Sequence, residues 1–336
     1  MIMTMAVLSA VLFSCVREEM TCDKELIVVQ RIGEGGYVYT RGAVISSNTD
    51  LKEETFGLYG SLTPNASVPQ PYFNASATVN ADLTAAISPL QYWPGLMNAS
   101  MTFFSWYPYS DANAPTASFT DPGEMVLNYT ANASAANHVD VLAAISGPVW
   151  VEGVNIHFYH TLTKVTFTFK KVAPVPDEVT IEGIEFQNVG KSGKLVMAEI
   201  PTATTKNGKP KFVWSDVATG KVASTPTGNK TVTEDATLMG DTFLMLPTDA
   251  FSATAKIVVT TNFGDREFLF SDIIAKNPHS WESGEYINYN LTISNETYQL
   301  SATPLEWTES PVNVIFDKQY YLKLSQTKVQ TLAIIP

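Results

Sequence analysis

The chain has 336 residues and is acidic, with 21 lysines and arginines against 33 aspartates and glutamates and a formal net charge of −12. Nucleic-acid binding is excluded, because a phosphate backbone needs clustered positive charge and the basic residues here are scattered. With 45% hydrophobic and 16% charged residues, the chain is not disordered. Its length is sufficient for two domains of ordinary size, each with its own core.

The first 13 residues form an apolar run, too short to span a bilayer and about right for the central region of a signal peptide. Leu12-Phe13-Ser14-Cys15 then resembles a bacterial lipobox, in which the cysteine receives a diacylglycerol. We therefore expect a signal peptide over 1–14, outer-membrane lipid on Cys15 and a tether over 15–24. Phe13 is bulky for its position, and no basic residue precedes the run. An ordinary secretory signal or a buried first strand is the alternative.

The body of the chain favours β-strands. "KVTFTFKK" (164–171) alternates apolar and polar residues, and the apolar set changes parity near Thr163–Lys164, which predicts a bulge or bend. "KIVVTTNFGDREFLFSD" (256–272) predicts a hairpin, and "GEYINYNLTIS" (284–294) predicts a strand. Helical signals are short, at most "ADLTAAI" and "VDVLAAI".

Turn residues gather at 107–123, 173–177 and 201–230. Many short strands without crossover helices cannot build a parallel sheet, so the sequence predicts an all-β chain of antiparallel sandwiches. The composition changes near residue 150, from Ala, Ser, Asn and Pro to longer strands with more Lys. We therefore expect an N-terminal domain over 25–153 and a C-terminal domain over 154–336.

Signals for chemistry are weak. Of the four histidines, His157 and His160 are three apart in a predicted strand, so they point to opposite faces and cannot chelate one metal. His160 lies on the apolar face and is interpreted as a core histidine. The chain has no G-x-S-x-G and no H-E-x-x-H motif. We therefore predict no enzyme, no metal site and no cofactor; the alternative is an enzyme whose two carboxyl groups, far apart in sequence, face each other in a cleft.

Two aromatic stretches, "YWPG" (92–95) and "FFSWYP" (103–108), permit two interpretations. In the first, the rings form a sugar-stacking platform, and the chain is a surface glycan-binding lipoprotein. In the second, the rings pack in the core and at the corners of the fold. The exposure of four rings separates these interpretations, since an exposed flat row favours glycan binding. The four are Trp93, Trp106, Tyr107 and Tyr109.

Several segments together carry a family resemblance. They are "QYWPGLMNASMTFFSWYP" (91–108), "HVDVLAAI" (138–145), "VNIHFYHTLTKVTFTF" (154–169), "WESGEYINYNLTIS" (281–294) and "LEW" (305–307). Their order resembles that of fimbrillin-like proteins of the Bacteroidales, the type V pilins and their relatives. The resemblance implies two transthyretin-like β-sandwich domains, an outer-membrane lipoprotein precursor at the cell surface, and a structural or adhesive role without catalysis. It also implies other fimbrial subunits as partners, and a host or bacterial surface receptor.

In type V pilins a trypsin-like protease cuts after an arginine near the N-terminus, and a strand from a neighbouring subunit fills the vacated groove. Arg41 precedes Gly42-Ala43 and resembles the cleavage junction of the family, with Arg31 as second choice. The alternative is that both are ordinary surface arginines beside a first strand.

A donor strand needs apolar bulk, alternation and a free end, and the C-terminus supplies these. "QYYLKLS" (319–325) alternates, and the terminal "VQTLAIIP" (329–336) ends in apolar side chains. Burial of four such side chains contributes about 6–12 kcal/mol before ordering costs. The predicted donor residues are Val329, Leu332, Ile334 and Ile335.

Overall fold

In a computed structural model of the chain, the described residues are 27, 45, 48–81, 84–96, 98–149, 155–172, 178–206, 208–228, 230–294, 298–305, 307 and 312–315. The all-β prediction is confirmed: the described part contains strands, two short 3-10 helices (Asn48–Leu51 and Ala135–Asn137) and a single α-helix, α1 (Phe270–Lys276). No helix in this part is long and apolar enough to cross a membrane. The lipid-attachment, cleavage and donor-strand predictions lie outside the described residues; they concern Cys15, Arg31, Arg41, Val329, Leu332, Ile334 and Ile335.

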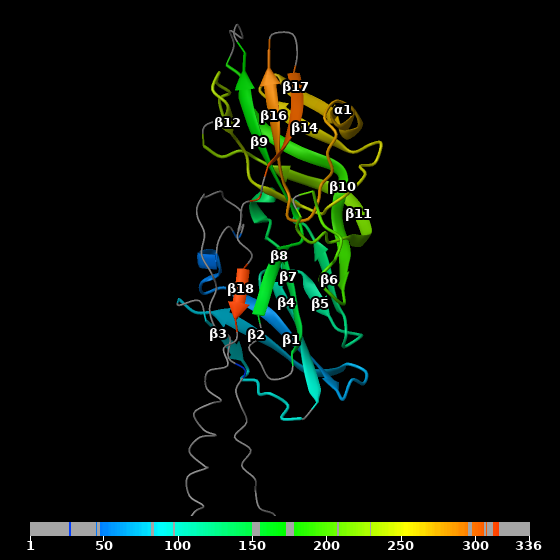
Figure 1. The fold of residues 1–336 in the computed structure, drawn as a ribbon. Coiled ribbons are helices and arrows are strands. Elements are labelled where there is room, and N and C mark those ends of the chain that lie inside the picture. The colour runs from blue at the N-terminus through cyan, green and yellow to red at the C-terminus, as the bar shows by residue number, and fades with distance from the viewer. Residues whose placement is uncertain are drawn as a thin grey trace, which may run out of the picture.

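A seven-stranded antiparallel sheet forms the lower half of the molecule in Figure 1, with the order β18-β8-β7-β4-β1-β2-β3. Its strands are β1 (Thr55–Pro64), β2 (Gln70–Val79), β3 (Ala85–Ser88), β4 (Ala99–Tyr107), β7 (Leu142–Val149), β8 (Asn155–His160) and β18 (Val312–Ile315). β18 comes from the far end of the sequence and pairs with β8 at the edge of the sheet.

Two further sheets complete the fold. The six-stranded sheet has the order β15-β14-β10-β6-β5, with β11 also pairing β10, and the five-stranded sheet has the order β12-β9-β16-β17, with β13 pairing β9. β9 and β16 form a parallel ladder. The bounds are β5 (Thr116–Ser118), β6 (Met125–Thr130), β9 (Thr163–Lys171), β10 (Ile181–Met197), β11 (Trp214–Ser224), β12 (Thr237–Leu238), β13 (Phe243–Met245), β14 (Lys256–Thr261), β15 (Gly264–Leu269), β16 (Tyr286–Ile293) and β17 (Tyr298–Leu305).

The seven-stranded sheet curls around its own core. The Phe56 ring on β1 lies 5.3 Å from the Phe158 ring on β8, although β4 and β7 separate these strands. A flat sheet would hold β1 and β8 about 14 Å apart. The inner face carries the concave core, which is completed by residues from outside the sheet. That core includes Ile27, Ile45, Leu51, Phe56, Leu58, Phe73, Val79, Met101, Phe103, Leu142, Ile156 and Phe158.

The outer face of the same sheet packs against the six-stranded sheet. This interface core brings Phe104 and Trp106 of β4 against residues of β6 and of the second half of β10. β10 is 17 residues long; its first half pairs with β14 and its second half with β6. β10 therefore belongs to both halves of the molecule, as its length in Figure 1 shows.

The C-terminal core lies between two layers. One layer is the first half of β10 and the strands paired with it, and the other is the five-stranded sheet. Trp281 is 1% exposed, and its ring lies edge-on to those of Phe186, at 5.2 Å, and Phe270, at 5.5 Å. Its indole N–H donates to the Tyr289 hydroxyl at 3.1 Å. The hydroxyl also bonds the His279 ring at 2.9 Å, so the polar atoms of this aromatic core are paired.

The predicted bend between two strands occurs at residues 161–162, where the chain leaves β8 in the seven-stranded sheet and enters β9 in the five-stranded sheet. The predicted hairpin of 256–272 is confirmed as β14 and β15, although its last residues form the start of α1. The two short helical signals are wrong: they contribute to β3 and β7. The predicted turn region 201–230 contains the whole of β11, paired to β10.

Candidate functional site

Two isoleucines fix the N-terminal segment to the concave core. Ile27 and Ile45 are each 5% exposed and belong to that core. The Ile27 backbone N–H donates to the Gln91 carbonyl oxygen at 2.9 Å, and the Ile45 N–H donates to Asp140 Oδ2 at 3.1 Å. These two anchors flank both predicted cleavage arginines in the sequence.

Asp140 is the polar centre of the second anchor. Its carboxylate is fully buried just before β7, and both oxygens lie near Nδ1 of His160, at 3.1 Å for Oδ1 and 2.9 Å for Oδ2. Since an ionised carboxylate can only accept, His160 Nδ1 carries the proton. A buried carboxylate is costly unless it is hydrogen-bonded, and here the Ile45 N–H and His160 are its partners. The interpretation of His160 as a core histidine agrees with this contact and with its 13% exposed side chain.

His160 also contacts Trp307, which lies between β17 and β18 in the sequence. The imidazole stacks on Trp307, with ring centroids 3.9 Å apart and planes 25° apart. The ammonium of Lys164 lies over the Trp307 ring at 5.5 Å and over the Tyr286 ring at 5.1 Å. Residues that are far apart in sequence therefore meet where β8 gives way to β9.

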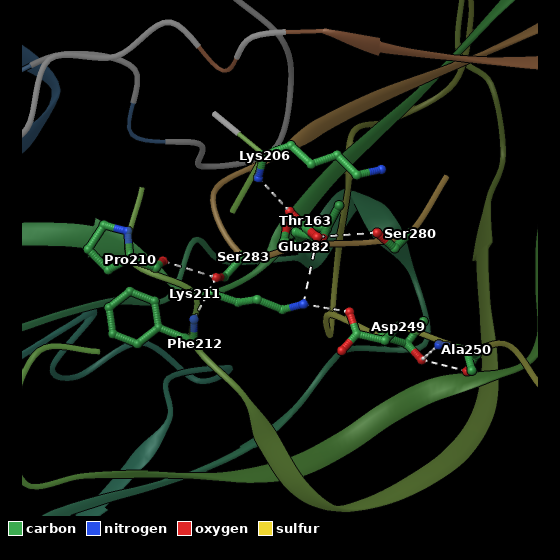
Figure 2. A network of polar contacts seen from close by, with 11 residues as sticks. Thr163, Lys206, Pro210, Lys211, Phe212, Asp249, Ala250, Ser280, Glu282 and Ser283 are labelled. Atoms are coloured by element: carbon green, nitrogen blue, oxygen red, sulfur yellow. Dashed lines mark hydrogen bonds and ion pairs between the residues drawn. The ribbon is translucent and has the colours of Figure 1, made fainter. Parts of the chain in front are cut away.

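A second polar network joins Lys206 and residues 210–212 to the turn that precedes β16 (Figure 2). Glu282 Oε2 accepts from the Lys206 backbone N–H at 3.0 Å. Lys211 Nζ lies 2.7 Å from Asp249 Oδ1 and 3.6 Å from Glu282 Oε1. The hydrogen bond to Asp249 raises the pKa of Lys211 above its usual value. Lys211 thus lies between two carboxylates, one of which also accepts from a backbone N–H, and this geometry suits the fastening of a loop.

His138 lies in the connection between β6 and β7 and bonds to β13 of the five-stranded sheet. Its Nδ1 accepts from the Leu244 N–H at 2.9 Å, and its Nε2 lies 3.0 Å from the Asn132 carbonyl oxygen. The Nε2 tautomer satisfies both bonds. Burial lowers the pKa of His138 to about 4. At neutral pH the ring is therefore uncharged and structural.

The four aromatic rings that separate the two interpretations do not form a flat exposed row. Trp106 and Tyr107 are each 4% exposed. Trp93 is half-buried, with its ring edge-on to Phe103 at 5.9 Å. Tyr109 alone of the four is exposed, at 40%. This arrangement favours core and corner packing over a sugar-stacking platform.

In the described part of the chain, no group of three or more His, Cys, Asp and Glu side chains is placed to hold a metal ion. His157 and His160 occupy positions of opposite parity on β8, as the sequence predicts.

Asp140 and Trp307 lie in segments that carry the family resemblance, but the sequence pattern predicts no role for either residue. A single carboxylate between Val139 and Val141 is the signal that could have marked Asp140, because a lone acid in an apolar run needs a buried partner.

Comparisons with known proteins agree with this fold. The model of a family described as fimbrillin-like matches residues 40–307. A candidate cell adhesion protein from Bacteroides uniformis is 14% identical, with a TM-score of 0.53 over 84% of this chain and 98% of that one. A fimbrial protein from Bacteroides vulgatus is 15% identical, with a TM-score of 0.53 over 83% of this chain and all of that one. No curated protein sequence matches the chain.

Proposed function

The chain belongs to the fimbrillin-like family, and from this premise we propose that it is a structural or adhesive fimbrial subunit of the cell surface. The observation that carries the proposal is the double anchoring of the N-terminal segment. Ile27 and Ile45 both complete the concave core, yet they lie on opposite sides of Arg31 and Arg41. A core shared across a protease site suits a subunit that is remodelled during assembly.

Export as an outer-membrane lipoprotein, acylated at Cys15, is part of this proposal. The tether 15–24 then leads from the lipid to Ile27. Substitution of Cys15→Ala is expected to release the protein from the membrane fraction and to abolish labelling by a fatty-acid probe. Labelling that persists in the variant would place the lipid elsewhere.

Cleavage after Arg41 by a trypsin-like protease would separate Ile27 from the mature chain and retain Ile45. The retained side keeps the bond from the Ile45 N–H to Asp140, so the chain before β1 stays fastened to the residue that precedes β7. Removal of the segment that contains Ile27 empties the space that this side chain fills in the concave core. It also removes the N–H that bonds the Gln91 carbonyl oxygen. We propose that the terminal segment of another copy takes this place, through Val329, Leu332, Ile334 and Ile335.

Limited trypsin treatment of the folded protein tests the maturation proposal. Cut protein is expected to begin at Gly42 and to form SDS-resistant ladders, and deletion of 329–336 is expected to prevent the ladders without unfolding the subunit. Arg41→Ala moves the cut to Arg31, while Arg31→Ala serves as the matched control. Cut protein that stays monomeric would contradict strand exchange through this tail.

A further inference from the structure

One end of the seven-stranded sheet carries a distinct surface. The turn between β1 and β2 (65–69) and the loop between β3 and β4 (89–96 and 98) lie together there, joined by a hydrogen bond from the Asn65 N–H to the Asn98 carbonyl at 2.9 Å. Both lie at the lower end of the molecule in Figure 1, opposite α1. We call these residues the loop surface.

The loop surface is apolar and uncharged. Leu90 is 64% exposed and Leu96 is 53% exposed, whereas large aliphatic side chains are normally buried. From Thr55 to Ser110 the sequence has a single charged residue, Asp82, although the whole chain is 16% charged and carries a net charge of −12. The loop surface is therefore a neutral area on an acidic protein.

The leucines project from a braced loop. The Tyr72 hydroxyl donates to the Tyr92 carbonyl oxygen at 2.8 Å, and the Trp93 ring packs edge-on to Phe103. Because Tyr92 and Trp93 are held in this way, Leu90 and Leu96 on either side of them face solvent from a fixed backbone. Tyrosine and tryptophan are also the aromatic residues enriched at membrane–water interfaces.

The N-terminal segment meets the body of the protein at this loop. The Ile27 N–H bonds the carbonyl oxygen of Gln91, the residue after Leu90. Cys15 lies 12 residues before Ile27 in the sequence, so even a fully extended tether reaches only about 40 Å. A lipid on Cys15 would hold the loop surface near the membrane.

We propose that the loop surface, centred on Leu90 and Leu96, rests on the lipid surface in the anchored protein, with both leucines in the headgroup region. This inference depends on the proposed acylation of Cys15. A neutral contact lets an acidic protein approach lipids without charge repulsion. The margin of the loop surface is acidic. Gly123 lies next to Pro69, since a Cβ on this glycine would be 3.3 Å from Pro69 Cγ. Asp121 and Glu124 are within two residues of Gly123 in the sequence. Val68 therefore lies at the rim of the contact.

Fluorescence on vesicles tests the contact. The chain from Cys15 onward, in a Cys22→Ser background, is coupled through Cys15 to a maleimide lipid in phosphatidylethanolamine–phosphatidylcholine vesicles. An environment-sensitive fluorescent amino acid replaces Leu90, Leu96 or Val213, the last being a matched control with 67% exposure immediately before β11. We expect a blue shift and quenching by brominated lipid at 90 and 96, unchanged in 0.5 M salt, and neither effect at 213.

Two results would overturn the proposal. Spectra at 90 and 96 that match the spectrum at 213 would show that the loop surface stays in water. A blue shift that depends on protein concentration and occurs without vesicles would show that a second copy covers the leucines.

In addition, Leu90→Ser with Leu96→Ser is expected to lower partitioning of the uncoupled chain to vesicles by about tenfold. Since the coupling is chemical, natural acylation can fail its own labelling test without affecting this result.

Discussion

The concave core and the C-terminal core differ in where their residues come from. The C-terminal core is built from residues 135–302, with Trp281, Tyr289 and Phe186 fully buried at its centre. The concave core needs Ile27 and Ile45, which precede the first strand of the sheet. One core is closed by its own strands and their connections, and the other is completed by a segment with predicted protease sites. Under the proposed function, the closed core therefore supplies stability, and the other core is the one that assembly would remodel.

The largest effect is expected in the closed core. Trp281→Ala removes three edge-on ring contacts and the donor to Tyr289, and should lower the free energy of unfolding by about 3–5 kcal/mol. Urea denaturation followed by circular dichroism measures the loss. Trp93→Ala, which truncates a half-buried ring, is the control and should cost clearly less. Equal losses would contradict the contrast between the two regions.

Asp140 fastens Ile45, which lies on the side of the concave core that the proposed cleavage after Arg41 would retain. Asp140→Ala leaves the Ile45 N–H and His160 Nδ1 without their acceptor, at a cost of about 3 kcal/mol. Trypsin should also cut the variant faster near Arg41, because the backbone beside that site loses its anchor. Asp249→Ala, with a 70% exposed side chain, should change stability by less than about 0.5 kcal/mol. Unaltered proteolysis of Asp140→Ala would refute the anchoring role.

Acid is expected to weaken the contact of His138 with β13 at the edge of the C-terminal core. Its pKa in the fold is about 4, because burial disfavours the charged ring, against about 6.5 in the unfolded chain. The unfolded chain therefore binds a proton more readily between pH 6.5 and 4, and stability falls as the pH drops through this window. At pH 5 the loss is about 2 kcal/mol. His138→Gln should reduce the difference in stability between pH 7 and pH 5 by this amount, and His157→Gln by less.

The strands with regular alternation were predictable. In β9, Val165, Phe167 and Phe169 are fully buried, as "KVTFTFKK" indicates. The short helical signals failed because seven residues are too few for a helix without tertiary support, and both runs pair with neighbouring strands instead. β11 was missed because its Gly, Thr and Ser resemble a loop, while its pairing with β10 depends on register shifts that only the tertiary structure reveals.

The candidate site was only partly predictable. Sequence motifs indicated which segments matter, but they could not show that Asp140, His160 and Trp307 meet, because these residues come from three separate segments. The division at 153/154 stays a prediction. The structure adds that β8 and β18 pair in the sheet that contains β1, a connection that no local pattern indicates.

The smallest effect gives the sharpest comparison between the two sides of the proposed cleavage site. Ile27 and Ile45 have the same side chain, the same 5% exposure and the same core. In the intact chain, Ile27→Val and Ile45→Val should each cost about 1 kcal/mol, measured by urea denaturation. After cleavage at Arg41 and removal of the released peptide, Ile45→Val should keep its cost, while Ile27→Val should become identical to the wild type. A persistent cost of Ile27→Val in cut protein would mean that the first segment stays bound, and that the concave core is as closed as the C-terminal one.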